Sequence, residues 1–201
     1  MVMHRFEGFF DEPPRIPDLD PLQQLGVPPH FRTCTFATLD SGSDPEAFGI
    51  CRQYAQQGEY QQRRGLVLRG QPGNGKTSLA IAILRQILAQ RSGRKGRFWN
   101  VPWGLYQLRR TCNRMDRVPY LQDLVDQDLL VLDDLGRQQI TPWTAEQLYL
   151  LLDELWTGDK QVIITTNLTA AAFVQTMAPA LVSRILGLCH EVPLHGPDRR
   201  G

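Results

Sequence analysis

Cysteine is scarce in this chain of 201 residues, and the few cysteines lack the spacing of a metal site or a redox pair. None belongs to a C-x-x-C pair, and no histidines stand at matching zinc-ligand spacing. The loose group of Cys189, His190 and His195 lacks a fourth ligand, so buried thiols are the favoured interpretation there. We therefore expect no zinc. The four cysteines are Cys34, Cys51, Cys112 and Cys189.

Long apolar runs and an excess of charge of one sign are also absent. No apolar segment approaches the ~20 residues that cross a bilayer, and residues 1–10 are too charged and too short for a secretory signal. With 22 basic and 21 acidic residues, the net charge of +1 gives no general attraction to nucleic acid or to a membrane surface. These features predict a cytoplasmic protein with reduced thiols and no membrane partner.

The charge that is present lies unevenly along the chain. Residues 1–25 are acidic and rich in proline, which predicts an extended N-terminal arm with little secondary structure of its own. The arm carries phenylalanines at positions 6, 9 and 10, and two interpretations stay open: a disordered tail or a docking peptide. Residues 26–201 are enough for one compact domain with a sizeable core.

The glycine-rich run GQPGNGKT at 70–77 fits the phosphate-loop pattern G-x-x-x-x-G-K-[ST] at every fixed position. It lies between residues 66–70, which predict a short buried strand, and residues 76–91, which predict a helix. A loop in that place directs backbone N–H groups and the positive end of a helix dipole at one anion. Lys76 is expected to reach the β- and γ-phosphates of ATP, and the Thr77 hydroxyl to bind Mg²⁺. The predicted nucleotide-binding residues are Gly70, Gln71, Pro72, Gly73, Asn74, Gly75, Lys76, Thr77 and Ser78.

Strand and helix patterns alternate through the rest of the domain. This alternation predicts a three-layer α/β fold with a parallel five-stranded sheet. Right-handed crossovers then place the ligand at the C-terminal ends of the strands. The further strands are expected at 97–101, 129–134, 161–167 and 189–194. Asp44-Pro45 is expected to open a helix before the first strand; the later helices are expected at 103–115, 118–127, 143–156 and, broken at Pro179, 169–186.

Polar side chains follow two of the predicted strands at the point where each strand ends. Asp133 and Asp134 come directly after the apolar run LLVL, and Asn167 follows the next strand. Asp133 is expected to bind Mg²⁺, and Asp134 to orient or deprotonate the attacking water. The alternative for the pair is a solvated turn before Gly136. Asn167 either polarises that water or caps the following turn, and its residue type does not separate these roles.

The segments DQDLLVLDDLG (126–136), VIITTNLT (162–169) and LVSRIL (181–186) resemble, in this order and spacing, the AAA+ ATPases of the DnaC/DnaI helicase-loader family and the related IstB transposition helpers. The stretch GVPPHFRTCTFATL (26–39) resembles the segment that leads into their ATPase core. The resemblance extends over residues 26–200. It implies a P-loop NTPase with an AAA+ core and, because few residues follow Asn167, no C-terminal helical lid domain.

The resemblance also implies roles for single residues. It matches residues 70–77 with Walker A, Asp133 and Asp134 with Walker B, and Asn167 with sensor 1. Arg184 matches the arginine finger that completes the ATP site of a neighbouring subunit, which implies self-association. Judged as one arginine on a helix, Arg184 has a surface ion pair as its alternative.

Basic residues concentrate between positions 85 and 117, on the side that faces single-stranded DNA in the resembling family. Backbone contacts with DNA and a solvated helix face are equal alternatives for these arginines. Trp99, Trp103 and Tyr106 are suited to base stacking, but burial in the core is the favoured interpretation for them. The candidate DNA-binding residues are Arg109, Arg110, Arg114 and Arg117.

The leading hypothesis is an ATP-hydrolysing AAA+ protein that loads or remodels a replicative hexameric helicase. Its cofactors are ATP and Mg²⁺, and its turnover is expected to be slow unless a partner or DNA stimulates it. The second hypothesis is a transposition helper that recruits a transposase to target DNA. The third is a non-hydrolysing competitor of a full-length loader, suggested by the short N-terminal region. A small-molecule kinase is disfavoured because nothing between residues 134 and 167 supplies an arginine-rich lid.

Overall fold

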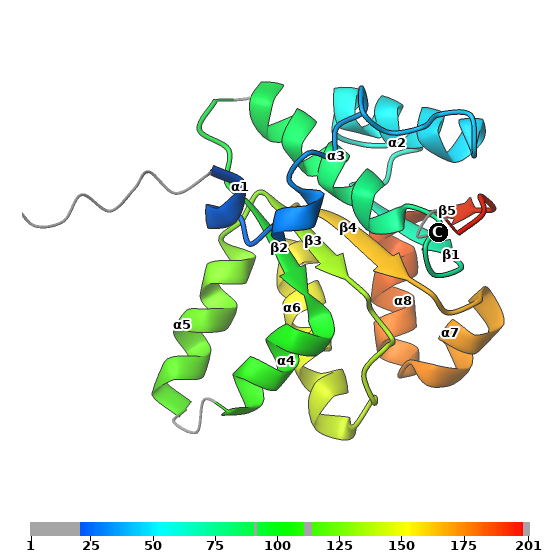
Figure 1. The fold of residues 1–201 in the computed structure, drawn as a ribbon. Helices are drawn as coiled ribbons and strands as arrows, with labels where there is room; N and C mark the ends of the chain where they lie inside the picture. The colour runs from blue at the N-terminus through cyan, green and yellow to red at the C-terminus, as the bar shows by residue number, and fades with distance from the viewer. Residues whose placement is uncertain (1–20, 91, 111–113, 199–201) are drawn as a thin grey trace, which may run out of the picture.

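A five-stranded parallel sheet forms the centre of the molecule, in the order β2-β3-β4-β1-β5 (Figure 1). The computed structural model describes residues 21–90, 92–110 and 114–198. The arrangement confirms the predicted α/β fold. The strands are β1 (Gly65–Gly70), β2 (Gly96–Asn100), β3 (Leu129–Asp133), β4 (Gln161–Thr166) and β5 (Cys189–Leu194).

Helices cover both faces of the sheet (Figure 1). One layer holds α2 (Pro45–Gln57) and α3 (Lys76–Gln90), and the other holds α5 (Arg114–Val125), α6 (Pro142–Thr157) and α8 (Pro179–Leu188). The remaining helices are α1 (Pro21–Gln24), η1 (Pro29–Phe31), α4 (Val101–Arg110) and α7 (Ala170–Thr176). None of the helices in the described residues combines the length and apolar character needed to cross a membrane.

Two apolar cores follow from the alternation of side chains along the strands. In β3, Leu129 and Val131 pack with the α2–α3 layer, whereas Leu130 and Leu132 pack with the α6–α8 layer. All four are fully buried, as expected for a central parallel strand covered on both faces. The sheet is therefore a rigid base that holds its C-terminal strand ends in fixed positions.

Side-chain caps and first-turn prolines mark the starts of several helices. The Asp44 carboxylate accepts a hydrogen bond from the Ala47 N–H and begins α2, and Pro179 stands in the first turn of α8, both as the sequence predicts. Several boundaries differ: the helix expected at 103–115 ends at Arg110, and two helix starts that differ involve proline. Pro102 lies in the first turn of α4, so this helix begins at Val101 instead of residue 103. A proline is tolerated there because the N–H it lacks has no partner within the helix.

The second of these helices is α5, which begins at Arg114, four residues before the predicted start at residue 118. Pro119 lies within this helix, where the sequence analysis placed a boundary. At this sixth position a proline costs the helix one backbone hydrogen bond, and the packing of Leu121, Leu124 and Val125 against the core offsets that loss.

Residues 21–25 belong to the folded domain, contrary to the expected extended arm over residues 1–25. Residues 21–24 form the short helix α1, and the carbonyl of Leu25 accepts a hydrogen bond of 2.7 Å from the Phe98 N–H of β2. Leu22 and Leu25 also pack against the core on the α3 side. Apolar burial explains the difference, because two leucines anchor a segment whose prolines suggest extended chain. Residues 1–20 lie outside the described part.

Candidate functional site

The phosphate loop leaves the C-terminal end of β1 and enters α3. Gly73 and Gly75 have φ angles of +83° and +91°, a backbone conformation that glycine adopts without the steric penalty of a side chain. The loop borders a cavity of about 250 Å³, which Lys76, Asp134 and Asn167 also line. Because α3 begins at Lys76, the N–H groups of its first turn would face an anion bound in this cavity.

Lys76 lies folded against the loop itself. Its Nζ donates hydrogen bonds to the carbonyl oxygens of Gly70 (2.9 Å) and Gln71 (2.7 Å) and to Oδ1 of Asn74 (3.0 Å). Asn74 is buried and donates from Nδ2 to the carbonyl of Leu194 on β5, at 2.9 Å. The ammonium group is thus held beside the cavity by the loop, and the loop is held by the sheet.

Asp133, the last residue of β3, receives three side-chain hydrogen bonds. Its Oδ1 accepts from the hydroxyls of Thr77 and Thr165, both at 2.8 Å, and its Oδ2 accepts from Nδ2 of Asn100 at 3.2 Å. Burial raises the pKa of Asp133, and the hydrogen bonds from the two threonines oppose that rise. A hydroxyl and a carboxylate side by side are oxygen ligands of the kind that Mg²⁺ prefers, so the two residues fit a magnesium ion.

Asp134 follows directly after β3, and its φ of +59° takes the chain out of the strand. Its Oδ1 accepts a long hydrogen bond of 3.5 Å from Nδ2 of Asn167, and its Oδ2 lies 3.3 Å from Nη1 of Arg137. Asn167 therefore faces Asp134, and the helix α7 that follows is capped by Thr169 instead. The structure thus brings the two candidate catalytic residues together at the rim of the phosphate-loop cavity.

Four further residues reach this site without having been singled out as site residues. Asn100 ends β2 directly opposite Asp133 in the strand register, and Thr165 is the last residue but one of β4. Both residues lie at the C-terminal ends of parallel strands, which share one edge of the sheet. Their position in a predicted strand was therefore the signal that could have identified them as site residues. Phe31 and Leu39 line the cavity from the N-terminal segment, and no pattern in the sequence points to them.

Arg184 lies away from this cavity, on α8. Its Nη2 is 2.5 Å from Oδ1 of Asp153 on α6, and its guanidinium is 5.7 Å from the ring centre of Trp156 and 5.9 Å from that of Tyr149. It is not among the residues that line the phosphate-loop cavity. Within one chain Arg184 therefore makes an intramolecular ion pair, and any catalytic contact would have to be with another subunit.

The four candidate DNA-binding arginines flank the turn between α4 and α5. Arg109 and Arg110 are exposed in the last turn of α4. Arg114 and Arg117 stand in the first turn of α5, where the side chains lie outside the described part of the chain.

The aromatic residues of this region are divided between core and surface. Trp99 is buried and donates from Nε1 to the Tyr120 hydroxyl at 2.8 Å, as the favoured interpretation predicts. That interpretation is wrong for Trp103 and Tyr106, which are 58% and 50% exposed. Their rings stack with centres 5.3 Å apart, and the Arg110 guanidinium lies 5.7 Å from the ring of Tyr106.

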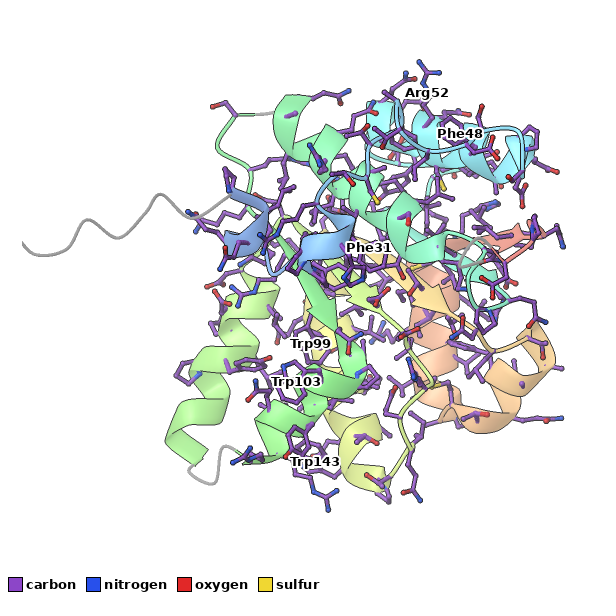
Figure 2. All side chains as sticks on the ribbon, viewed as in Figure 1. Phe31, Phe48, Arg52, Trp99, Trp103 and Trp143 are labelled. Atoms are coloured by element: carbon purple, nitrogen blue, oxygen red, sulfur yellow. The ribbon has the colours of Figure 1, made fainter. Side chains whose placement is uncertain are left out.

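We call Trp103, Tyr106 and Arg110 the aromatic row of α4, because they follow one another along one face of the helix. Trp103 of this row lines a cleft of about 630 Å³ together with Phe31, Trp99, Thr77 and Asp133, so the cleft reaches residues of the phosphate-loop site. Phe31, Trp99 and Trp103 are labelled on this side of the molecule in Figure 2.

Together, the phosphate loop after β1, the acids after β3, the polar tip of β4 and the strand order define a P-loop NTPase with an AAA+ core. The family described as IstB-like ATP binding protein matches residues 54–200. The chain belongs to this family, and the resemblance to DnaC/DnaI-like AAA+ proteins is confirmed.

Two curated relatives from Bacillus subtilis (strain 168) also match. The uncharacterized protein YqaM is 27% identical over 136 residues, which cover 65% of this chain and 42% of YqaM. The phage-like element PBSX protein XkdC is 26% identical over 182 residues, which cover 80% of this chain and 64% of XkdC. The matched regions thus span less than two thirds of either relative.

Solved structures of replication proteins share the fold. The DnaC helicase loader superposes with a TM-score of 0.74 at 23% identity, covering 83% of this chain and 99% of the other. DnaI gives 0.71 at 20% identity, covering 87% and 94%. The replication initiator DnaA bound to AMPPCP and single-stranded DNA gives 0.67 at 18% identity, covering 80% and 50%. At these identities the likeness establishes the AAA+ core fold.

Proposed function

We propose that this chain binds ATP with Mg²⁺, hydrolyses the ATP, and loads or remodels a replicative hexameric helicase. The observation that carries the proposal is the junction at Asp133, where the Thr77 hydroxyl of the phosphate loop lies 2.8 Å from a buried strand-end carboxylate. Burial makes the charged form of this acid unfavourable and so raises its pKa. A cation bound next to Asp133 would stabilise its charged form and explain a carboxylate at this buried position.

Each residue of the proposed site has a distinct task. The N–H groups of the loop and the Lys76 ammonium hold the phosphates, and Thr77 with Asp133 holds Mg²⁺, whose charge neutralises the phosphate oxygens. Asp134 orients the attacking water, or accepts its proton, and Asn167 fixes the Asp134 carboxylate through the 3.5 Å contact. In this proposal Arg184 acts on the site of a neighbouring subunit, since it lines no part of its own.

The helicase-related role is supported by the fold shared with the DnaC helicase loader and DnaI. Binding of single-stranded DNA is supported by a different feature, the aromatic row of α4 with Arg109 beside it. Exposed aromatic rings stack on bases of any sequence, and arginines contact the backbone phosphates. The cleft that both Trp103 and Asp133 line supports a DNA surface next to the metal site in this proposal.

The test is ATP turnover measured alone, with single-stranded DNA, and with a cognate hexameric helicase. Replacing Lys76 by alanine removes three charge-assisted hydrogen bonds from the loop and should weaken ATP binding about 10- to 100-fold, with a parallel loss of turnover. Arg64→Gln is the matched control, because it removes a cation whose ion pair with Asp159 lies on the surface. Helicase loading that is unchanged in Lys76→Ala would overturn the proposal.

The second candidate function is recruitment of a transposase to target DNA. It is favoured by the match to the IstB-like family over residues 54–200. The two functions differ in partner, so ATP-dependent binding should be measured with purified replicative helicase and with purified transposase from the same source. Binding to the transposase alone would replace the loader role by the helper role while leaving the ATPase site intact.

A further inference from the structure

We propose that Thr165 is a positioning residue that fixes both acids of the site, Asp133 through its carboxylate and Asp134 through its backbone. This inference rests on the proposed ATPase function and deepens it. Thr165 is fully buried one residue before the end of β4, directly after Ile164, which forms the last ladder pair with Leu132 of β3.

The Thr165 hydroxyl forms hydrogen bonds with two adjacent residues, as a donor to one and as an acceptor from the other. It donates its proton to Oδ1 of Asp133 at 2.8 Å, and it accepts the N–H of Asp134 at 2.9 Å. A hydroxyl has one proton to give and lone pairs to receive with, so a single group satisfies both demands. An aliphatic side chain of the same shape would satisfy neither.

The bond to the Asp134 N–H matters because that residue has a left-handed conformation. Its φ of +59° is costly for a residue with a side chain and persists only when the surroundings impose it. This turn takes the chain out of β3 directly after Asp133. The Thr165 hydroxyl holds the amide at the start of the turn, and the carbonyl of Thr165 accepts the N–H of Leu135 at 2.9 Å just after it.

Thr166 continues the same connection on the far side of the turn. Its buried hydroxyl donates to the carbonyl of Leu135 at 2.7 Å and accepts the N–H of Leu168 at 3.2 Å. The pair of threonines thus fastens the loop that carries Asp134 to the loop that carries Asn167. The distance between these two catalytic candidates depends on that attachment, and Thr165 is the member that also reaches the metal-binding acid.

The test compares Thr165→Val, which keeps the shape and loses the hydroxyl, with Thr165→Ser, which keeps the hydroxyl. In Thr165→Val, kcat for ATP should fall at least about 10-fold while KM changes less than about 3-fold, because Lys76 and the loop are untouched. Thr165→Ser should return kcat to within about 3-fold of the parent. Thr144→Val is the control for the loss of a buried, bonded threonine hydroxyl at the start of α6, which bonds to Thr141 and not to the acids.

A second measurement does not depend on catalysis. Hydrogen exchange of the Asp134 amide, followed in the protein without nucleotide, should be at least about 10-fold faster in Thr165→Val, and unchanged in Thr165→Ser and Thr144→Val. Faster exchange in a protein that never hydrolyses ATP would remove the proposed function and leave the positioning role. Normal turnover and normal exchange in Thr165→Val, or equal losses in Thr144→Val, would overturn the positioning role and leave the function.

Discussion

At the scale of single residues, the site is dominated by a buried carboxylate held by neutral donors. Asp133 is 5% exposed, and its hydrogen bonds come from two threonine hydroxyls and one amide. None of these groups carries a charge, so the ionised acid is only partly compensated, and burial raises its pKa. The carboxylate that is suited to bind a cation therefore lowers the stability of the fold when no ligand is bound.

Replacing Asp133 by asparagine should stabilise the protein without ligand at pH 7. A gain of about 1 kcal/mol corresponds to about 2–4 °C in Tm for a chain of this size. An acid whose pKa is raised on folding loses stability as pH rises from its unfolded value through its folded value. The advantage of the variant should thus be absent well below pH 4, grow as pH rises, and then level off.

The measurement is thermal unfolding of both proteins across this pH range, with EDTA and without nucleotide. A lower Tm for Asp133→Asn at pH 7 would contradict the expectation. The same variant should lose the dependence of ATP affinity on Mg²⁺, which separates the stability of the fold from the role of the site.

At the scale of elements, α6 depends on its first turn. Thr141 and Thr144 form a reciprocal capping box, in which each hydroxyl accepts the backbone N–H of the other residue. This helix supplies Leu148, Leu151 and Leu152 to the core beneath the sheet, so fraying of its start loosens buried contacts.

Thr141→Ala should lower stability by about 1 kcal/mol, because one N–H of the first turn loses its partner. This change corresponds to a fall in Tm of about 2–4 °C. The control is Thr157→Ala in the last turn of the same helix, where the hydroxyl is exposed and donates to carbonyls of its own helix. Equal effects of the two variants would show that the cap is unimportant.

The helix α4 is the element that connects the site with a surface. It begins at the end of β2, where Asn100 accepts the N–H of Trp103 through Oδ1 and donates to Asp133 through Nδ2. One amide thus touches both the start of the aromatic row and the proposed metal-binding acid.

Trp103→Ala should weaken binding of an oligo(dT) by about 5- to 100-fold, the range for loss of one stacked base. Fluorescence anisotropy at several salt concentrations measures this, and affinity should fall as salt rises because phosphate contacts release counterions. Trp156→Ala, which removes an exposed tryptophan from α6, is the matched control. Equal affinity of the parent and Trp103→Ala would place the DNA elsewhere or exclude it.

At the scale of the whole molecule, the site has its acids and its phosphate loop in one chain and its expected arginine on a distant helix. Arg184 is bound to Asp153 across the α6–α8 surface, with Trp156 beneath its guanidinium. Such a residue can serve an ATP site only if two copies of the chain meet with this surface against the open cavity.

Mixing two inactive variants tests that arrangement. Lys76→Ala lacks the lysine of the site and Arg184→Ala lacks the arginine, so a mixed assembly contains some complete sites and should recover part of the ATP turnover. Arg184→Ala alone should lose about 10³-fold or more of the stimulated rate. Asp153→Asn controls for loss of the ion pair; a defect as large as that of Arg184→Ala would make Arg184 structural, as would the absence of recovery in the mixture.

Much of the fold and of the site could be predicted because both depend on local patterns. The strand LLVL must be covered on both faces, and GQPGNGKT between a strand and a helix specifies a phosphate loop by its glycines and lysine. The ends of parallel strands meet at one edge, which brought Asp133 and Asn167 to the same region. The start of α5 and the folding of residues 21–25 could not be predicted, because the prolines in both segments indicate a break in structure. In the folded protein, tertiary packing keeps α5 helical and partly buries residues of the 21–25 segment.

By itself, then, the sequence determined the succession of strands and helices along the chain, the phosphate loop and the residue types at the strand ends. The strands and helices follow from the spacing of apolar residues, and the phosphate loop follows from the special geometry of glycine. Only the tertiary structure decided that Trp103 lies at the surface while Trp99 lies in the core, that Phe31 reaches the cavity, and that Thr165 touches both acids. Those facts depend on which segments meet across the sheet, and contacts between distant residues leave no trace in the local pattern of a single sequence.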